Sequence, residues 1–320
     1  DSVASRGLGD VYKRQDYRYE INASDEILTR TSETYRRIRN TARFLLANLD
    51  GFDPAKHLVK PKKMLALDRW AVDLARRLQE DIVKAYDTYQ FHLIYQKIHQ
   101  FCSVDLGGFY LDVLKDRQYT SKTDSVARRS AQTALYHIME AFVRWLAPIL
   151  SFTAEEMWSY IPGKRNESVF LNTWYEELQA LPENELMNQA FWEELRRVRE
   201  VVNKEIENQR NIGNLGAGLE AIVDLYCEPS LKTKLDALED ELRFVFITSG
   251  ARVHAYHSGL EGVVKTDIPD LALRVTPVAF PKCERCWHRR ADVGSNTVHP
   301  TLCVRCVDNV DGIGEVRKFA

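Results

Sequence analysis

The sequence has no long hydrophobic run. Although 45% of its 320 residues are hydrophobic, no stretch of about 18 residues is continuously apolar, so no membrane-spanning helix is predicted. The first residues are mostly polar and offer no apolar core of a secretory signal. With 28% charged residues, the composition is that of a soluble globular protein. We therefore expect a cytoplasmic protein that makes no membrane contact.

The chain also lacks a large net charge. Lysine and arginine together number 44 and aspartate and glutamate 46, which gives a formal charge of −2 at pH 7. A protein with this balance has no global positive field to attract nucleic acid. DNA is therefore not an expected partner, and any contact with RNA must come from local basic patches.

Signatures of catalysis are absent as well. The sequence contains no P-loop, no GxGxxG after a predicted strand, no GxSxG elbow and no HExxH helix. The stretch "TSKTD" at residues 120–124 lies between two predicted helices, without the sheet of a nucleotide-binding fold, and is interpreted as a linker. Paired carboxylates such as Glu155 and Glu156 are interpreted as helix-capping residues. No catalytic residue is predicted.

Cysteine is scarce, and its distribution is uneven. Of six cysteines, two stand alone, at Cys102 and Cys227, and four form two CxxC pairs separated by 16 residues. This spacing is typical of a four-cysteine zinc site. Four thiolates complete a tetrahedron and leave no open coordination position, which predicts one structural Zn²⁺. Bound metal then supplies folding free energy on the order of 10 kcal/mol or more. The predicted ligands are Cys283, Cys286, Cys303 and Cys306.

Other interpretations of the cysteine segment are weaker. A redox dithiol needs one CxxC at a helix start in a thioredoxin-like setting, which is missing here. Two disulfides would need an oxidising compartment, whereas the isolated cysteines favour a reducing cytosol. Iron–sulfur ligation is the minor competitor. His288 and His299 lie nearby and could replace a cysteine, but with four thiols present we expect them beside the metal or at the surface.

Hydrophobic periodicity predicts a mainly α fold. Ser24 is a good helix N-cap, and from Leu28 to Leu49 the spacings alternate between three and four residues, which is typical of a helix that buries one stripe. Further helical stretches begin near Leu67, at Phe91, at Ser125 and at Ser151. In the last of these, Thr153 and Glu156 fit a capping box. Long helices joined by short breaks predict an antiparallel bundle over residues 23–180.

The pattern then changes to a small α+β unit, predicted over residues 185–280. A helical stretch over 191–210 leads into the glycine-rich "NIGNLGAG", and the segments "LEAIVDLYC", "RVHAYH" and "LALRVTPVAF" are predicted strands around the helix "SLKTKLDALEDELRFVF". Residues 281–320 form the predicted zinc knuckle. Residues 1–22 show no clear periodicity and are interpreted as an unmatched or linker segment, either the edge of a truncated product or a disordered arm.

Two local features could bind RNA. Arg36, Arg39 and Arg43, with Asn40 between them, flank the apolar stripe of the first helix, and such a face can track an RNA backbone. A merely solvated face is the alternative that the spacing alone favours. In the zinc segment, an aromatic ring beside guanidinium groups suits stacking on an unpaired base. The alternative is a ring that covers the knuckle's core. The residues concerned are Trp287, Arg289 and Arg290.

Several segments together resemble the C-terminal part of the bacterial isoleucyl-tRNA synthetase family. They are "SDEILTRTSETYRRIRNTARFLLANLDGFDPAKH", "LKDRQYTSKTDSVARRSAQTALYHI", "RWLAPILSFTAEEMWSYIPG" and the terminal "CERCWH…CVRC". The resemblance implies a helical anticodon-binding domain, an α+β junction and a zinc-bearing tail. It makes the four paired cysteines zinc ligands. It also implies a tRNA-facing first helix and an anticodon contact at the tryptophan of the knuckle.

The same resemblance sets the functional expectations. The family ligates isoleucine to its tRNA with ATP, but its HIGH-type and KMSKS-type signatures are missing from these 320 residues. The chain alone is therefore expected to be inactive and to contribute recognition of isoleucine tRNA, with ATP needed only by the catalytic domain. We expect a monomer. The rival hypothesis is a stand-alone helical interaction module, stapled by zinc, that binds protein partners.

Overall fold

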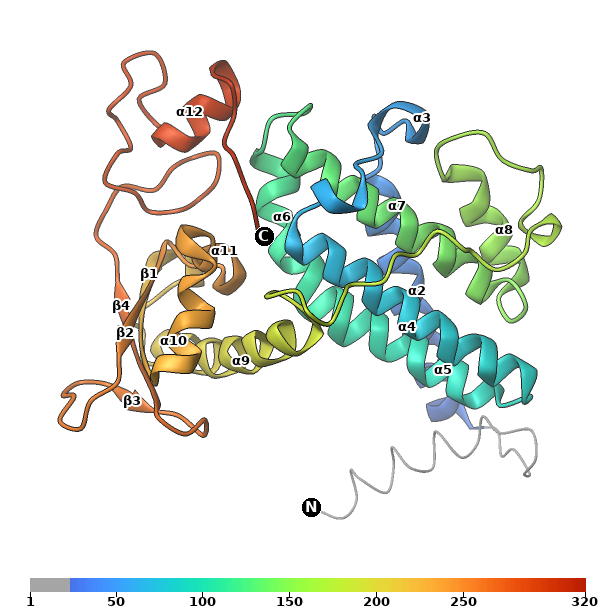
Figure 1. Cartoon of the computed structure of the whole chain (residues 1–320), viewed down its shortest axis with the longest axis horizontal. Helices are drawn as coiled ribbons and strands as arrows, with labels where there is room; N and C mark the ends of the chain where they lie inside the picture. Colours follow the sequence, from blue (N-terminus) through green and yellow to red (C-terminus); the bar gives the residue numbers. More distant parts are fainter. Residues whose placement is uncertain (1–23) are drawn as a thin grey trace. The chain divides into compact units, whose positions relative to one another are not determined.

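The structure is a computed structural model that describes residues 24–320 (Figure 1). The interpretation of residues 1–22 lies outside the described part. The described chain divides into two compact units. One comprises the described residues up to Pro61, with Ala71–Asp112 and Gln132–Ala180. The other comprises Lys62–Trp70, Val113–Ala131 and Leu181–Ala320.

Helices make up most of residues 24–211, as the periodicity predicted. The first described helix is α2 (Asp25–Ala47), and the Ser24 hydroxyl accepts from the backbone N–H of Ile27 at 3.3 Å, so the predicted N-cap is confirmed. Gly51, at φ 68°, follows its end. The later helices are α3 (Pro54–His57), α4 (Ala66–Asp87), α5 (Phe91–Gln100), α6 (Leu111–Thr120), α7 (Val126–Leu146), α8 (Ser151–Tyr160) and α9 (Gln189–Asn211).

The apolar stripe of α2 is buried only in its second half. Ile38, Ala42 and Leu45 are buried, whereas the Leu28 side chain is 62% exposed among the described residues. Around the buried half, the first unit has a helical-bundle core. Its largest fully buried side chains are Leu45, Ile82, Ile94, Phe101, Tyr110, Phe142 and Trp145.

The third predicted helix is interrupted by a change of helix type. Residues Phe101–Tyr110, between α5 and α6, form a π-helix, in which the N–H of Leu111 bonds to the carbonyl of Leu106. A Cβ on Gly107 would lie 2.8 Å from the carbonyl oxygen of Cys102. Only glycine therefore fits this turn of the widened helix without a shift. A continuous apolar pattern cannot distinguish the two helix types.

The predicted capping box of α8 is wrong. The helix begins at Ser151, after Leu150, which supplies no side-chain cap. Thr153 instead shares a 3.0 Å hydrogen bond with the hydroxyl of Tyr35. Glu155 accepts from the backbone N–H of Val169 at 3.0 Å, so neither glutamate of the predicted pair caps the helix.

The second unit contains a four-stranded sheet of order β2-β1-β4-β3. Strand β1 pairs in parallel with β2 and antiparallel with β4, which also pairs antiparallel with β3. The first, second and fourth strands match the predicted segments, and the two-residue β3 was not predicted. Their bounds are β1 (Ala221–Cys227), β2 (Gly250–Ala255), β3 (Val264–Lys265) and β4 (Leu271–Pro277).

One face of this sheet is packed against helices. Alternate residues of β1 are buried, and α9, α10 (Pro229–Asp236) and α11 (Leu242–Phe246) lie on that side (Figure 1). The single helix predicted over residues 230–246 is broken between α10 and α11, where Glu239 takes a left-handed φ of 51°. The other face of the sheet carries Ile222, Asp224 and Tyr226 of β1, which are half-buried.

The cysteine segment has little regular structure apart from α12 (Val304–Asp311). Its core consists of the four cysteines of the two CxxC pairs, with only Val293 and Leu302 packed against them. So small an apolar core cannot hold a fold by itself. Among residues 24–320, no helix is both long and apolar enough to cross a membrane.

Candidate zinc site and basic surfaces

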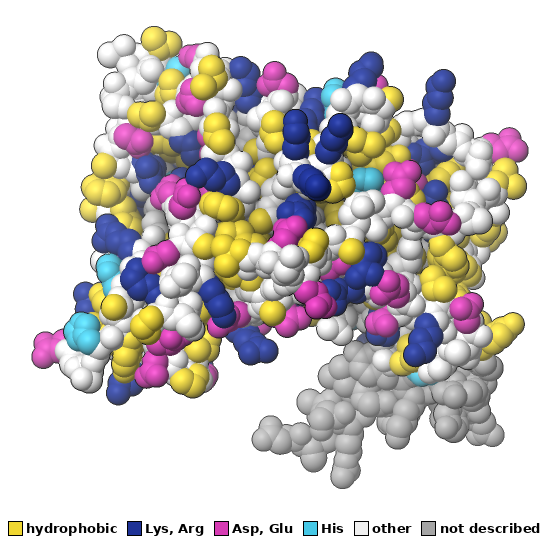
Figure 2. All heavy atoms as spheres, viewed as in Figure 1, with side chains coloured by type: hydrophobic (Ala, Val, Ile, Leu, Met, Phe, Trp, Pro, Cys, Tyr) yellow, Lys and Arg dark blue, Asp and Glu magenta, His cyan; other side chains and the backbone are white. Residues whose placement is uncertain are grey.

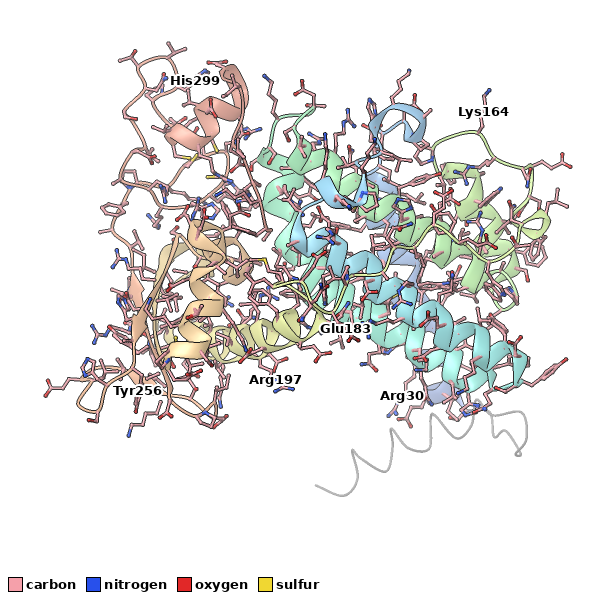
Figure 3. All side chains as sticks on the ribbon, viewed as in Figure 1. Arg30, Lys164, Glu183, Arg197, Tyr256 and His299 are labelled. Carbon is pink, nitrogen blue, oxygen red and sulfur yellow. The ribbon has the colours of Figure 1, made fainter. Side chains whose placement is uncertain are left out.

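The structure brings the four paired cysteines together. Cys283 and Cys286 flank a tight turn in which the N–H of Trp287 bonds to the carbonyl of Cys283 at 2.9 Å. Cys303 is the N-cap residue of α12, and Cys306 lies in its first turn. All four side chains are buried, and their sulfur atoms lie within 4.8 Å of one another. Figure 3 shows the sulfur atoms gathered beside α12.

The sulfur cluster has the dimensions of a zinc site. A tetrahedron with Zn–S bonds of about 2.3 Å has sulfur–sulfur edges of about 3.8 Å, and the Sγ atoms of Cys286 and Cys303 lie 3.7 Å apart. No described cysteine forms a disulfide. The backbone N–H of Cys303 donates to the Cys283 sulfur at 3.3 Å, and such donors stabilise thiolate ligands. Soft thiolate donors in this arrangement fit Zn²⁺.

Crowded thiols share protons unequally. Hydrogen bonds from the thiols of Cys303 and Cys306 lower the pKa of Cys286, while the hydrogen bond to Cys286 raises the pKa of Cys306. The hydrogen bonds among the crowded thiols favour loss of a proton from the cluster. A divalent cation bound at the centre would take the place of the shared protons.

Neither nearby histidine belongs to the cluster. His288 is buried, its Nδ1 lies 3.2 Å from the carbonyl oxygen of Cys286, and its ring packs edge-on against Phe244. His299 pairs instead with Asp311, its Nε2 2.6 Å from a carboxylate oxygen, and lies in the loop before α12 (Figure 3). The described residues therefore offer four sulfur ligands and no imidazole at this position.

A buried ionic network fastens the zinc segment to α6 within the second unit. Asp116 accepts from both terminal nitrogens of Arg305, at 2.7 and 2.8 Å, and from Arg317 at 3.3 Å. Burial alone would raise the pKa of Asp116, but the positive charge of Arg305, with that of Arg317, lowers it to about 2. Arg305 also contacts Glu315 at 3.3 Å. Asp116 is distant in the sequence from its partners, which lie close together near the C-terminal end.

Further contacts join the same two parts. Arg285 donates to the backbone carbonyl of Thr120. The Lys122 ammonium donates to the carbonyl of Gly312 at 2.9 Å. The stretch "TSKTD" links α6 to α7, as interpreted from the sequence, and it also contacts the zinc segment. Arg317 lies 3.2 Å above the Phe244 ring, and burial lowers the pKa of that guanidinium to about 10.

Trp287 is displayed rather than buried. Its side chain is 60% exposed, so the alternative in which it covers the knuckle's core is wrong. Its φ of 66° is a left-handed conformation that costs a bulky residue strain. The Lys282 ammonium lies 5.1 Å from its ring centroid. The turn thus holds an aromatic face and a positive charge together at the surface.

The two neighbouring arginines differ in their environment. Arg289 donates to a carboxylate oxygen of Glu220 at 2.6 Å, and its backbone N–H donates to the Ser249 hydroxyl. Arg290 only approaches Asp292, at 3.8 Å, and keeps 37% of its side chain exposed. Of the two, Arg290 is the freer to meet a ligand.

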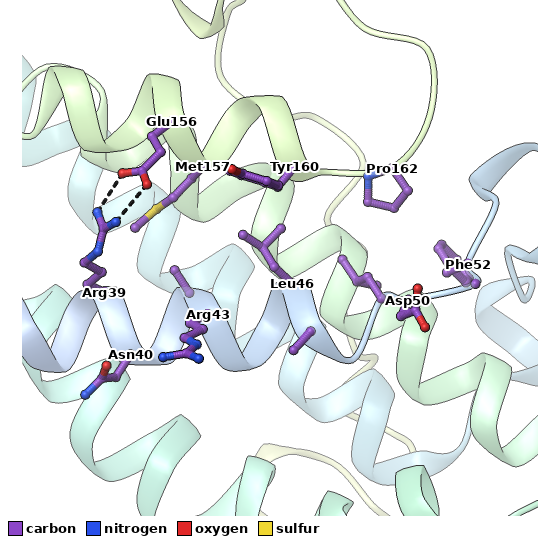
Figure 4. A pocket seen from close by; sticks show the side chains of 14 residues that line it. Arg39, Asn40, Arg43, Leu46, Asp50, Phe52, Glu156, Met157, Tyr160 and Pro162 are labelled. Atoms are coloured by element: carbon purple, nitrogen blue, oxygen red, sulfur yellow. Dashed lines mark hydrogen bonds and ion pairs between the residues drawn. The ribbon is translucent and has the colours of Figure 1, made fainter.

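The predicted basic face of α2 is exposed at all four positions, Arg36, Arg39, Asn40 and Arg43. Arg39 forms a bidentate ion pair with Glu156 of α8, at 2.7 and 2.8 Å (Figure 4). This pairing was not predicted. Among residues 24–320, Arg36 and Arg43 have no ion-pair partner.

An open pocket of about 700 Å³ lies beside this face, between α2 and α8. Arg39, Asn40 and Arg43 line it, whereas Arg36 does not. Most of its remaining wall is apolar or aromatic, as at Leu46, Met157 and Tyr160, and Asp50 and Glu156 add two carboxylates (Figure 4). A basic rim over an apolar wall suits a flat, charged ligand such as a nucleotide.

Sequence reasoning missed the residues that hold the sites in place. Asp116 and Glu156 are ordinary helix-surface carboxylates in the sequence, and their partners are distant along the chain. The charge of the cysteine segment gave no signal, because its 12 charged residues out of 40 are close to the 28% of the whole chain. Since surface charges usually remain solvated, a count of them does not identify partners.

Comparisons with known proteins agree with this geometry. The model of the family "Anticodon-binding domain of tRNA ligase" matches residues 68–225. The model "Zinc finger found in FPG and IleRS" matches residues 280–309, which contain all four paired cysteines. The isoleucine–tRNA ligase of Methylococcus capsulatus is 60% identical over 304 residues, which cover 95% of this chain and 32% of that protein.

This chain resembles the C-terminal part of bacterial isoleucine–tRNA ligases. The isoleucine–tRNA ligase of Thioalkalivibrio sulfidiphilus is likewise 60% identical, over 308 residues, and that of Azotobacter vinelandii is 55% identical over 305. The resemblance predicted from the motifs is thereby confirmed. The chain spans about a third of the length of the isoleucine–tRNA ligases it matches.

Proposed function

We propose that this chain is a tRNA-binding portion of an isoleucine–tRNA ligase and that it reads the anticodon region of isoleucine tRNA. The observation that carries the proposal is the match to an anticodon-binding domain and a zinc finger in one chain whose relatives are isoleucine–tRNA ligases. The exposed basic and aromatic groups supply the chemistry that such binding needs. The predicted functional division into 23–180, 185–280 and 281–320 is part of this proposal.

The α2 face contacts the RNA backbone. Arg36 and Arg43 are exposed, and their charges are not neutralised within the described residues. Each guanidinium can replace a counterion on a phosphate, which is the main source of affinity for nucleic acid. Arg39 is held by Glu156 and serves chiefly to fix the wall of the pocket. Asn40, at the rim, can donate to a base edge.

The zinc knuckle presents Trp287 to an unpaired base. One structural Zn²⁺ on Cys283, Cys286, Cys303 and Cys306 holds the turn, and the left-handed backbone at Trp287 turns its ring outward. A ring displayed in this way stacks on bases at about 1–3 kcal/mol each. Arg290 adds a partly exposed charge beside it. The cysteines themselves make no contact with RNA in this proposal.

The catalytic half of the reaction lies outside these residues. Ligation of isoleucine to tRNA with ATP belongs to the longer relatives, and the present chain supplies recognition. We expect the isolated chain to be monomeric, cytoplasmic and inactive in aminoacylation. Sedimentation should give the mass of one chain.

The test is binding of transcribed isoleucine tRNA to the zinc-loaded chain at moderate salt. Trp287→Ala should weaken binding about tenfold. Arg36→Gln should lower the salt dependence of binding by about one counterion. Arg197→Gln, on the exposed side of α9 (Figure 3), is the matched control and should leave affinity unchanged. Equal binding of an unrelated tRNA would contradict the proposal.

Metal analysis separates the remaining interpretations. About one tightly held zinc per chain, with no thiols that titrate in the native protein, is expected for a four-cysteine site. Two titratable thiols and no metal would favour the redox dithiol. A chain that holds zinc and captures protein partners, with no enrichment of tRNA, would favour the stand-alone interaction module.

A further inference from the structure

We propose that the uncovered face of the four-stranded sheet is a second RNA contact, which stacks an unpaired base on Tyr226 and His254 and holds the adjoining phosphate with Arg252 and Arg274. The inference rests on the proposed function only in taking RNA as the ligand. It adds a surface that neither the motifs nor the family matches assign.

The strand register places these four residues on one face. In the parallel pair, Tyr226 lies beside His254 and Asp224 beside Arg252. In the antiparallel pair, Asp224 lies opposite Arg274. Directly paired residues project to the same side of a sheet. Because the alternate residues Val223 and Leu225 are buried under the helices, the paired set faces away from them.

The aromatic pair is already arranged as a platform. The rings of Tyr226 and His254 are stacked, with centroids 4.9 Å apart and an angle of 26° between their planes. The Nε2 atom of His254 lies 2.8 Å from a carboxylate oxygen of Asp224, which fixes the orientation of the imidazole. The His254 side chain remains 41% exposed. Flat rings displayed on a sheet are the usual means by which proteins hold single-stranded RNA.

Positive charge surrounds the platform. Arg274 donates from Nε and Nη2 to the carbonyl oxygens of Gly262 and Glu261, at 3.1 and 2.7 Å, and its guanidinium lies 5.9 Å from the Tyr226 centroid. These carbonyls fix the side chain without neutralising its charge. Arg252 is 61% exposed and only approaches Asp224, at 3.9 Å. Both guanidinium groups can therefore bind phosphate.

The composition of the face favours RNA over a protein partner. The four strands contain a single acidic residue, Asp224, against Arg252, His254, Lys265 and Arg274. Figure 2 shows Lys, Arg and His side chains along the border of the molecule beside the sheet. The exposed Val264 lies opposite Leu273 and so belongs to the helix side, which leaves Ile222 and Ala272, neither of them exposed, as the aliphatic residues of this face. A protein interface would need a larger apolar centre, whereas charge complementarity and stacking suffice for an unpaired nucleotide.

The test measures binding of the zinc-loaded 320-residue chain to isoleucine tRNA and to unstructured oligouridine. Tyr226→Leu should weaken both about tenfold, and Tyr226→Phe, which keeps the ring, should restore binding. Arg252→Gln should lower the salt dependence by about one counterion. The matched controls are Tyr119→Leu, an exposed tyrosine on α6, and Arg197→Gln, and neither should change binding to oligouridine.

The outcomes separate the two proposals. If tRNA binds and a folded Tyr226→Leu chain binds it like the wild type, the sheet face is not an RNA contact, although the proposed function stands. If oligouridine binding depends on Tyr226 but isoleucine tRNA is not preferred, the sheet proposal stands and the proposed function fails. Should Tyr226→Leu not fold, His254→Ala makes the same test at a side chain that is 41% exposed. A dimer that Tyr226→Leu dissociates would overturn the inference.

Discussion

Replacing Asp116 by asparagine should detach the zinc segment from α6. The substitution keeps the shape of the side chain and removes the charge that Arg305 and Arg317 share. Two buried guanidinium groups are then left with Glu315 as their nearest carboxylate, at 3.3 Å from Arg305 and 3.9 Å from Arg317. Breaking a buried ion pair in this way costs about 3–5 kcal/mol. Because Glu315 remains, the lower end of that range is expected.

The pKa of Asp116 gives an independent estimate. It lies at about 2, against an ordinary value of 3.8, and the difference corresponds to roughly 2 kcal/mol of folding free energy. Since the folded-state pKa is the lower one, this contribution is complete above about pH 4 and is lost as the pH falls toward 2. Both estimates agree that Asp116→Asn should cost about 2–3 kcal/mol at pH 7.

The assay is urea unfolding followed by tryptophan fluorescence, with zinc content measured on the folded protein. Asp311→Asn is the matched control, because this carboxylate on α12 is 58% exposed and, among residues 24–320, forms an ion pair only with His299. It should change stability by less than about 0.5 kcal/mol. If Asp116→Asn costs no more than Asp311→Asn, the network does not anchor the segment. Asp116→Asn should cost less in an Arg305→Met background than in the wild type, because the main partner of the carboxylate is already gone. The same cost in both backgrounds would also refute the pairing.

Three further perturbations test other parts of the structure. Removing the metal with a chelator at neutral pH should unfold residues 281–320, so that their amides lose protection from hydrogen exchange while those of α7 keep it. Unchanged protection of residues 281–320 would refute a structural metal. Gly107→Ala should destabilise the chain by about 1–3 kcal/mol in urea unfolding, because the new Cβ would lie 2.8 Å from the carbonyl oxygen of Cys102. Gly108→Ala is the control and should cost less than half as much, because its Cβ would lie 3.4 Å from the nearest carbonyl oxygen. Glu156→Gln should free Arg39 and strengthen the salt dependence of tRNA binding, with little change in the unfolding midpoint.

Much of the fold followed from local patterns. The N-cap at Ser24 and the alternating burial of β1 are set by neighbouring residues and by periodicity. The π-helix at Phe101–Tyr110 was not predictable in this way, because its apolar pattern is also that of an α-helix. Nor was the break at Glu239, where a left-handed residue interrupts a good helical sequence. These features depend on tertiary packing.

The cysteine site was predictable because metal geometry imposes a spacing. Two CxxC turns are a common way to place four thiolates around one ion, so the sequence alone indicates the cluster. The contact of Asp116 with Arg305 spans 189 positions and follows no spacing rule. Glu156, the partner of Arg39, is separated from it by 117 positions. Long-range ion pairs of this kind leave no local signal in one sequence.

These ion pairs change which basic residues are available to RNA. The zinc segment contains seven lysines and arginines. Of these, Arg285 donates to the carbonyl of Thr120, and Arg305 and Arg317 both pair with Asp116. Arg289 and Lys318 are paired as well, with Glu220 and Glu239. A count of basic residues therefore overstates the charge that a ligand meets. The residues left are those beside the exposed ring, so phosphate contacts in this segment should concentrate around Trp287, at Lys282 and Arg290.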